Sequence, residues 1–184
     1  ALMPTNRFNP FEDRLSRDIR NELSESLIDV LAHNTLEPAR VVAHRYLNNE
    51  PPSEYVSYIE TRLERYSRSL EHALHTAGDV IVCGGILWDL ELFFEVHEVL
   101  EPAWMKATGT EKLLLQALIR AAGVFMNLEY GYIERARKIS CKAIPVLTEH
   151  GSRLQNRLAI ERLLAGLDAC SLPAPQISLP NSIT

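Results

Sequence analysis

The chain has 184 residues, of which 46% are hydrophobic, and its formal net charge is -5 at pH 7. This composition can bury a core without disulfides, and it excludes the strongly basic surface that collects nucleic-acid phosphates. Cys83, Cys141 and Cys170 are far apart and lack CxxC spacing, so a reducing cytoplasm is expected. The longest apolar run, residues 80–88, is too short for a bilayer span. Neither nucleic acid nor membrane is therefore expected as a partner.

Residues 1–78 are expected to form an N-terminal helical region. Asn9, Pro10 and Glu12 have the order of an N-cap, a first helical residue and a third-position acceptor, which predicts a helix over residues 10–32. Two further helices are predicted, over residues 37–47 and, capped by Ser53, over residues 53–75. The double proline at 51–52 separates them, because proline lacks the backbone donor that a helix interior needs.

Residues 79–170 are more apolar and are expected to form a helical bundle domain. The β-branched run 80–85 has the composition of a strand, but no partner strand is recognisable, so a helix or an irregular segment is expected. Helices are predicted over residues 86–104, 111–129 and 132–147, and Ser152 opens a last one. Residues 171–184 contain three prolines and no periodicity, which predicts a tail. The fold class is all-α, a bundle of about six to seven helices with short antiparallel connections.

The helix predicted over residues 86–104 carries polar residues on its apolar face. At 100° per residue, its apolar side chains spread over roughly 120°; they are Ile86, Leu90, Phe93, Val96, Leu100 and Trp104. His97 falls in the middle of this stripe, with Glu101 one turn further on. Glu95 and Glu98 point to its margin or away. Buried polar groups need partners, so a polar cluster is predicted inside the bundle.

The next helix offers partners for that cluster. Gln116 and Arg120 lie on the polar stripe of the segment 111–129. Either this stripe faces water, or it meets the His97 helix across the hairpin. In the second case Arg120 binds Glu98 or Glu101 through its guanidinium, and Gln116 orients the imidazole.

Two interpretations of the cluster remain open. In one, a hydrogen-bonded network fixes the register of the helices. In the other, His97 and Glu101 hold a metal ion and Glu98 is a base, because residues four apart converge on one ion. The second histidine of the His-Glu-x-x-His zinc motif is missing here, so no metal or other cofactor is assigned. Cys83 is a further candidate, as a nucleophile beside His97.

Three segments of this region are similar to a known family. They are residues 87–89 with 93–104, residues 115–119 and residues 131–137. Together they resemble the family called domain of unknown function number 309, typified by Phe-Glu-Ala-His-Glu-x-Leu-Glu-x-x-Trp, Gln-Gly-Leu-Ile-Gln and Gly-Asn-x-x-Gly-Ala-Arg helices. The resemblance covers about residues 87–147 and implies a small helical bundle. It also implies a shared site at Glu95, His97, Glu98, Glu101, Trp104 and Gln116, without a known activity.

The chain departs from this pattern at several positions. Asp89 stands where asparagine is usual, Tyr132 replaces another asparagine, and Glu91 and Arg135 replace glycines. Arg120 replaces the second glutamine, and its positive charge beside the carboxylates counts against a bound cation.

The function expected from these features is that of a ligand-binding or partner-binding helical module. Its polar cluster consists of Glu95, His97, Glu98, Glu101, Trp104, Gln116 and Arg120. The ligand is an unidentified small molecule or a protein, and self-association is one form of partner binding. The alternative is a metal-assisted hydrolase with His97 and Glu101 as ligands and Glu98 as general base.

Overall fold

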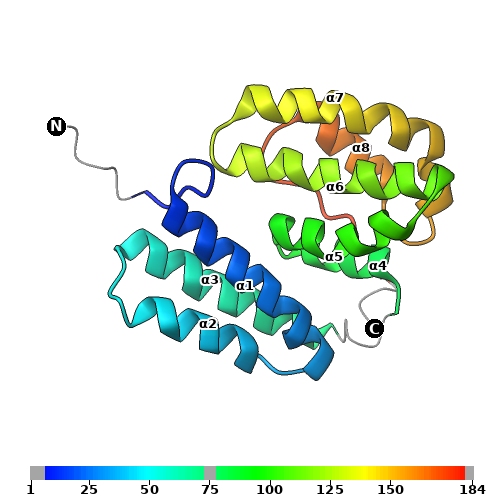
Figure 1. Ribbon diagram of the computed structural model, residues 1–184. Coiled ribbons are helices and arrows are strands. Elements are labelled where there is room, and N and C mark those ends of the chain that lie inside the picture. Colours follow the sequence, from blue (N-terminus) through cyan, green and yellow to red (C-terminus); the bar gives the residue numbers. More distant parts are fainter. Residues whose placement is uncertain (1–6, 73–77, 181–184) are drawn as a thin grey trace. The chain divides into compact units, whose positions relative to one another are not determined.

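The computed structural model describes residues 7–72 and 78–180, and within them the protein has eight α-helices and no strands (Figure 1). The predicted all-α class is confirmed. The chain divides into two compact units, residues 1–75 and 76–184. None of the described helices combines the length and the hydrophobicity that a bilayer span requires.

The first unit contains α1 (Arg14–His33), α2 (Glu37–Leu47) and α3 (Ser53–Glu71). Both α2 and α3 pack against α1, around the fully buried side chains of Ile19, Leu23 and Ile59. The N-cap predicted at Asn9 is wrong. The N-cap of α1 is Asp13, whose carboxylate accepts a hydrogen bond from Ser16 N at 2.9 Å.

The turn before α1 and the start of α3 also differ from the prediction. Asn9 accepts a hydrogen bond from Phe11 N and holds a separate turn before α1. Ser53 is the first residue of α3, after an N-cap at Pro52. The end predicted for this helix, at residue 75, lies outside the described residues.

The second unit begins with α4 (Val80–Asp89), so the β-branched run is helical. Asp79 caps α4 by accepting hydrogen bonds from Ile81 N and Val82 N. The single helix predicted over residues 86–104 is wrong, because α4 ends and a separate helix, α5 (Phe93–Lys106), follows. Glu91 lies between them with φ 58°, in the left-handed region, and no regular helix continues through that conformation.

A hairpin of α6 (Gly109–Glu129) and α7 (Ile133–His150) forms the largest part of this unit. Figure 1 shows the two helices side by side, and α6 also packs against α5. Gly131 makes the turn with φ 82°. The core contains Trp88, Phe93 and Phe125, whose ring centroids lie 5.2–5.6 Å apart.

The region after α7 differs most from the prediction. The helix expected to open at Ser152 is wrong: the short 3-10 helix η2 (Gly151–Leu154) and a turn come first, and α8 spans Ile160–Ala169. The segment expected to be a tail contacts α4, since Trp88 Nε1 donates a hydrogen bond to the Pro175 carbonyl at 2.8 Å. Ile177 is 2% exposed, so residues 175–178 are part of the domain.

Candidate functional site

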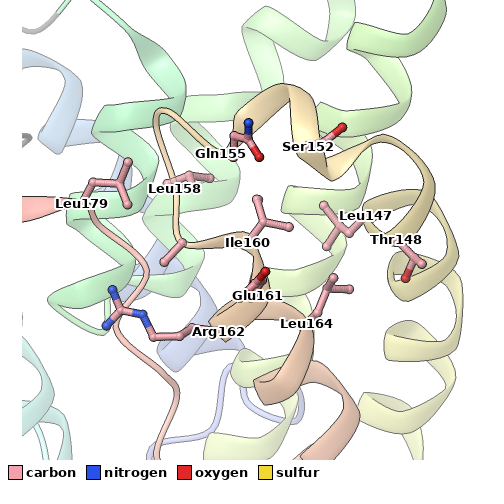
Figure 2. Close-up of a pocket in the computed structure, with 11 residues that line it drawn as sticks. Leu147, Thr148, Ser152, Gln155, Leu158, Ile160, Glu161, Arg162, Leu164 and Leu179 are labelled. Carbon is pink, nitrogen blue, oxygen red and sulfur yellow. The ribbon is translucent and has the colours of Figure 1, made fainter.

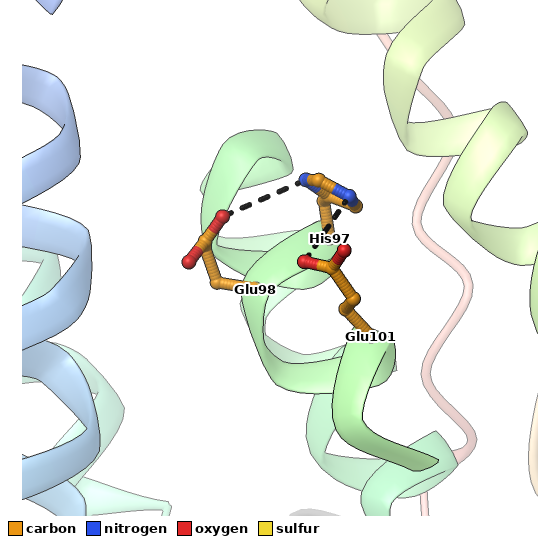
Figure 3. A group of neighbouring side chains, drawn as sticks. All are labelled: His97, Glu98 and Glu101. Atoms are coloured by element: carbon orange, nitrogen blue, oxygen red, sulfur yellow. Dashed lines mark ion pairs between the residues drawn. The ribbon is translucent and has the colours of Figure 1, made fainter. Parts of the chain in front are cut away.

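One face of α5 carries three polar side chains that converge: His97, Glu98 and Glu101 (Figure 3). His97 Nδ1 lies 3.7 Å from Glu98 Oε1, and His97 Nε2 lies 3.7 Å from Glu101 Oε2. The imidazole therefore stands between two carboxylates, each facing a different ring nitrogen. Both distances exceed those of good hydrogen bonds, so the contacts are ion pairs when the imidazole is protonated.

These side chains are only partly buried. The exposed fractions are 34% for His97, 25% for Glu98 and 43% for Glu101. The prediction that His97 lies in the middle of a buried stripe is wrong. The stripe was predicted for one continuous helix, with Leu90 at its far edge. Because the helix is interrupted before α5, Leu90 belongs to a different element, and His97 lies at the margin of the apolar face of α5.

The three groups form a set of metal-ligand donors. One donor atom from each side chain lies within 4.8 Å of the other two. An imidazole nitrogen and two carboxylate oxygens are ligands that first-row divalent ions such as Zn²⁺, Mn²⁺ and Fe²⁺ accept. Three protein ligands leave coordination positions for water or a small ligand.

Glu95 and Trp104 lie on the same helix but not in this group. Glu95 is fully buried, although the helical wheel directed it to the margin or away. Trp104 is partly exposed, with Lys112 Nζ 5.0 Å from the centre of its ring. Its indole N–H is buried and has no hydrogen-bond acceptor among the described residues.

Gln116 and Arg120 are half-buried on α6. Within residues 7–72 and 78–180, no hydrogen bond or ion pair joins either of them to His97, Glu98 or Glu101. The predicted hydrogen-bonded network between these two side chains of α6 and the imidazole is therefore not formed among the described residues. The positive charge of Arg120 does not neutralise the two carboxylates by direct contact.

Cys83 does not fit the role of a nucleophile. Its side chain is in the buried part of α4, and burial, reinforced by the nearby Asp79 carboxylate, raises the pKa of the thiol to about 11. A catalytic cysteine requires the opposite shift, because the thiolate is the reactive form.

Comparisons with known proteins match part of the second unit to a family. A protein of Synechococcus sp. (strain CC9902), named as a subunit of NAD(P)H-quinone oxidoreductase, is 26% identical over 142 residues, or 77% of this chain. The chain spans only 36% of that protein's length. No solved structure matches. Residues 81–139 match the family model described as Domain of unknown function (DUF309), so the resemblance inferred from the motifs is confirmed and the protein contains a DUF309 domain over those residues.

Proposed function

We propose that the protein is a helical binding module that holds a divalent first-row transition-metal ion at His97, Glu98 and Glu101. The convergence of three donor atoms within 4.8 Å supports this assignment. With a neutral imidazole the three ligands carry two negative charges, which balance a divalent cation.

The exposure of the site also favours ion binding over a purely structural network. A structural network of buried polar groups is closed to solvent. Here all three side chains are partly exposed, and the two His97–carboxylate distances are 3.7 Å. A hydrated ion has access to such a site.

Binding of one ion requires a small rearrangement. Because Glu98 and Glu101 face different ring nitrogens, one side chain has to rotate toward the other two. Partly exposed side chains change rotamer on the picosecond to nanosecond timescale. The rearrangement therefore needs no change in the backbone of α5.

Thermal melting with and without Zn²⁺, Mn²⁺ or Co²⁺ tests this proposal. Trp88 and Trp104 both belong to the second unit, so tryptophan fluorescence reports the unit that carries the site. An ion at a hundred times its Kd stabilises the protein by about 2.7 kcal/mol. We expect a metal-dependent rise in Tm for the wild type, and its loss in His97→Ala and Glu101→Gln.

The chain offers a matched control for these variants. His150 lies 3.6 Å from Glu149 on α7, which gives a histidine–carboxylate pair that has no third donor among the described residues. His150→Ala should keep the metal-dependent rise in Tm. Loss of the rise in this control, or its persistence in His97→Ala, contradicts the assignment.

A substitution of Glu98 distinguishes this proposal from the alternative of a metal-assisted hydrolase. A residue used as a ligand is not available as the base that removes a proton from metal-bound water. Our proposal expects Glu98→Gln to weaken metal binding about as strongly as Glu101→Gln. In a hydrolase with Glu98 as base, the same variant keeps its metal and loses turnover of ester or phosphate substrates.

Partner binding is a second candidate, supported by the distant match to a protein that is named as part of a larger enzyme. If the shared region serves assembly, the tagged full chain should enrich components of NAD(P)H-quinone oxidoreductase from a Synechococcus lysate. Failure to enrich any of them counts against this candidate and leaves the metal proposal unaffected.

A further inference from the structure

A second candidate site lies outside residues 81–139. The end of α7, η2 and the start of α8 surround a cavity of about 410 Å³ (Figure 2). Cavities that bind small molecules typically measure roughly 300–1,000 Å³. None of the residues that line this one belongs to the group around His97.

The apolar lining of this cavity is entirely aliphatic. It consists of Leu147, Leu158, Ala159, Ile160, Leu164 and Leu179. Leu147 and Leu158 are almost fully buried. Branched aliphatic side chains contact a flexible hydrocarbon chain well, whereas no aromatic ring is present among them to stack on a planar ligand.

The polar lining is exposed. Thr148, Ser152 and Gln155 supply hydroxyl and amide groups, and Glu161 and Arg162 supply opposite charges. Arg162 forms no ion pair within the described residues. Figure 2 shows its side chain extending away from that of Glu161, as expected for adjacent positions on a helix. A guanidinium without an internal partner can bind a carboxylate with two hydrogen bonds.

The walls of the cavity are held by close packing. A Cβ atom on Gly151 would lie 2.7 Å from Ile160 Cγ2, so η2 and α8 meet without space between them at that point. Leu158 pairs with Ser178 in an isolated β-bridge. The Asp89 carboxylate accepts a hydrogen bond from Ser178 N at 3.1 Å, next to the cavity-lining Leu179. The lining segments are therefore fixed before any ligand arrives, which reduces the entropy lost on binding.

We propose that this cavity binds a medium-chain aliphatic carboxylic acid, with the hydrocarbon chain against the leucine and isoleucine side chains and the carboxylate at Arg162. The aliphatic lining favours a ligand with a hydrocarbon chain, and the positive charge of Arg162 favours a negatively charged head group. Thr148 and Ser152 supply hydroxyl groups to another part of the lining, and Figure 2 shows both across the cavity from Arg162.

Calorimetric titration of the full chain with sodium octanoate tests this proposal, with residues mapped by amide NMR shifts. We expect saturable binding that perturbs the amides of residues 147–164. Arg162→Gln should weaken the affinity by about tenfold or more, because the charged hydrogen bonds from the guanidinium to the carboxylate are lost. Thr148→Trp places a large ring at an exposed position of the lining and should block binding by filling the cavity.

Two controls accompany these variants. Arg153→Gln changes another exposed arginine, which does not line this cavity, and Glu149→Trp adds the same bulk at the neighbouring exposed position. Both should bind octanoate like the wild type. The proposal is overturned if octanoate does not bind, if Thr148→Trp binds it normally, or if octanol binds as tightly as octanoate.

Discussion

Asp89 at the end of α4 accepts a 2.7 Å hydrogen bond from the backbone N–H of Ile177, 88 residues further along the chain. The other carboxylate oxygen accepts from Ser178 N at 3.1 Å. One side chain thus satisfies two backbone donors of residues 175–178, which are not helical. The C-terminal segment is held by this carboxylate and by the buried side chain of Ile177.

Asp89→Ala should therefore lower the free energy of unfolding of the second unit by about 2–4 kcal/mol, because two hydrogen bonds to a charged group are lost. Asp89→Asn keeps one acceptor oxygen and should lose less. Urea denaturation followed by tryptophan fluorescence measures both. Asp168→Ala, at an exposed position of α8, is the control, and equal stability of the Asp89→Ala and Asp168→Ala variants would contradict this role.

Two glycines of the α6–α7 hairpin should respond in opposite directions to substitution by alanine. A Cβ atom at Gly123 or at Gly131 meets no atom within 4 Å. At both positions, the effect of alanine on stability therefore depends on the backbone conformation alone. Gly123 lies inside α6, and Gly123→Ala should stabilise the unit by about 0.5–1 kcal/mol. Gly131 has φ 82°, and Gly131→Ala should destabilise it by about 1–2 kcal/mol. A shift of the same sign in both urea midpoints would refute the account of this turn.

Cys83 should be unreactive in the folded protein. With a pKa of about 11, about one thiol in a thousand is ionised at pH 8, and burial further hinders access. In a variant with Cys141→Ser and Cys170→Ser, Ellman's reagent should label Cys83 only after unfolding. Rapid labelling of the native variant would restore the nucleophile hypothesis.

The sequence predicted those parts of the fold that depend on local patterns. The double proline before α3 separated two helices of the all-α fold, and the motif of α5 identified the family. The break before α5 was missed, because apolar residues continue through it and hydrophobic patterns do not record the sign of φ. One signal was present: Glu91 stands where the family has glycine, and its φ is positive.

The packing of the C-terminal segment could not be predicted for a different reason. Its hydrogen bonds reach Asp89 and Trp88, 87 to 89 residues away in the chain. No local spacing encodes such contacts. The convergence of His97, Glu98 and Glu101 follows from their spacing on α5, but the exposure of His97 depended on the missed helix break.

The most direct test of the central claim is the number of metal ions bound per chain, measured by elemental analysis after equilibrium dialysis against Zn²⁺. We predict one ion per chain for the wild type and for His150→Ala, and none for His97→Ala. No bound ion in the wild type, or an equal content in His97→Ala, would contradict the assignment of His97, Glu98 and Glu101 as a metal site.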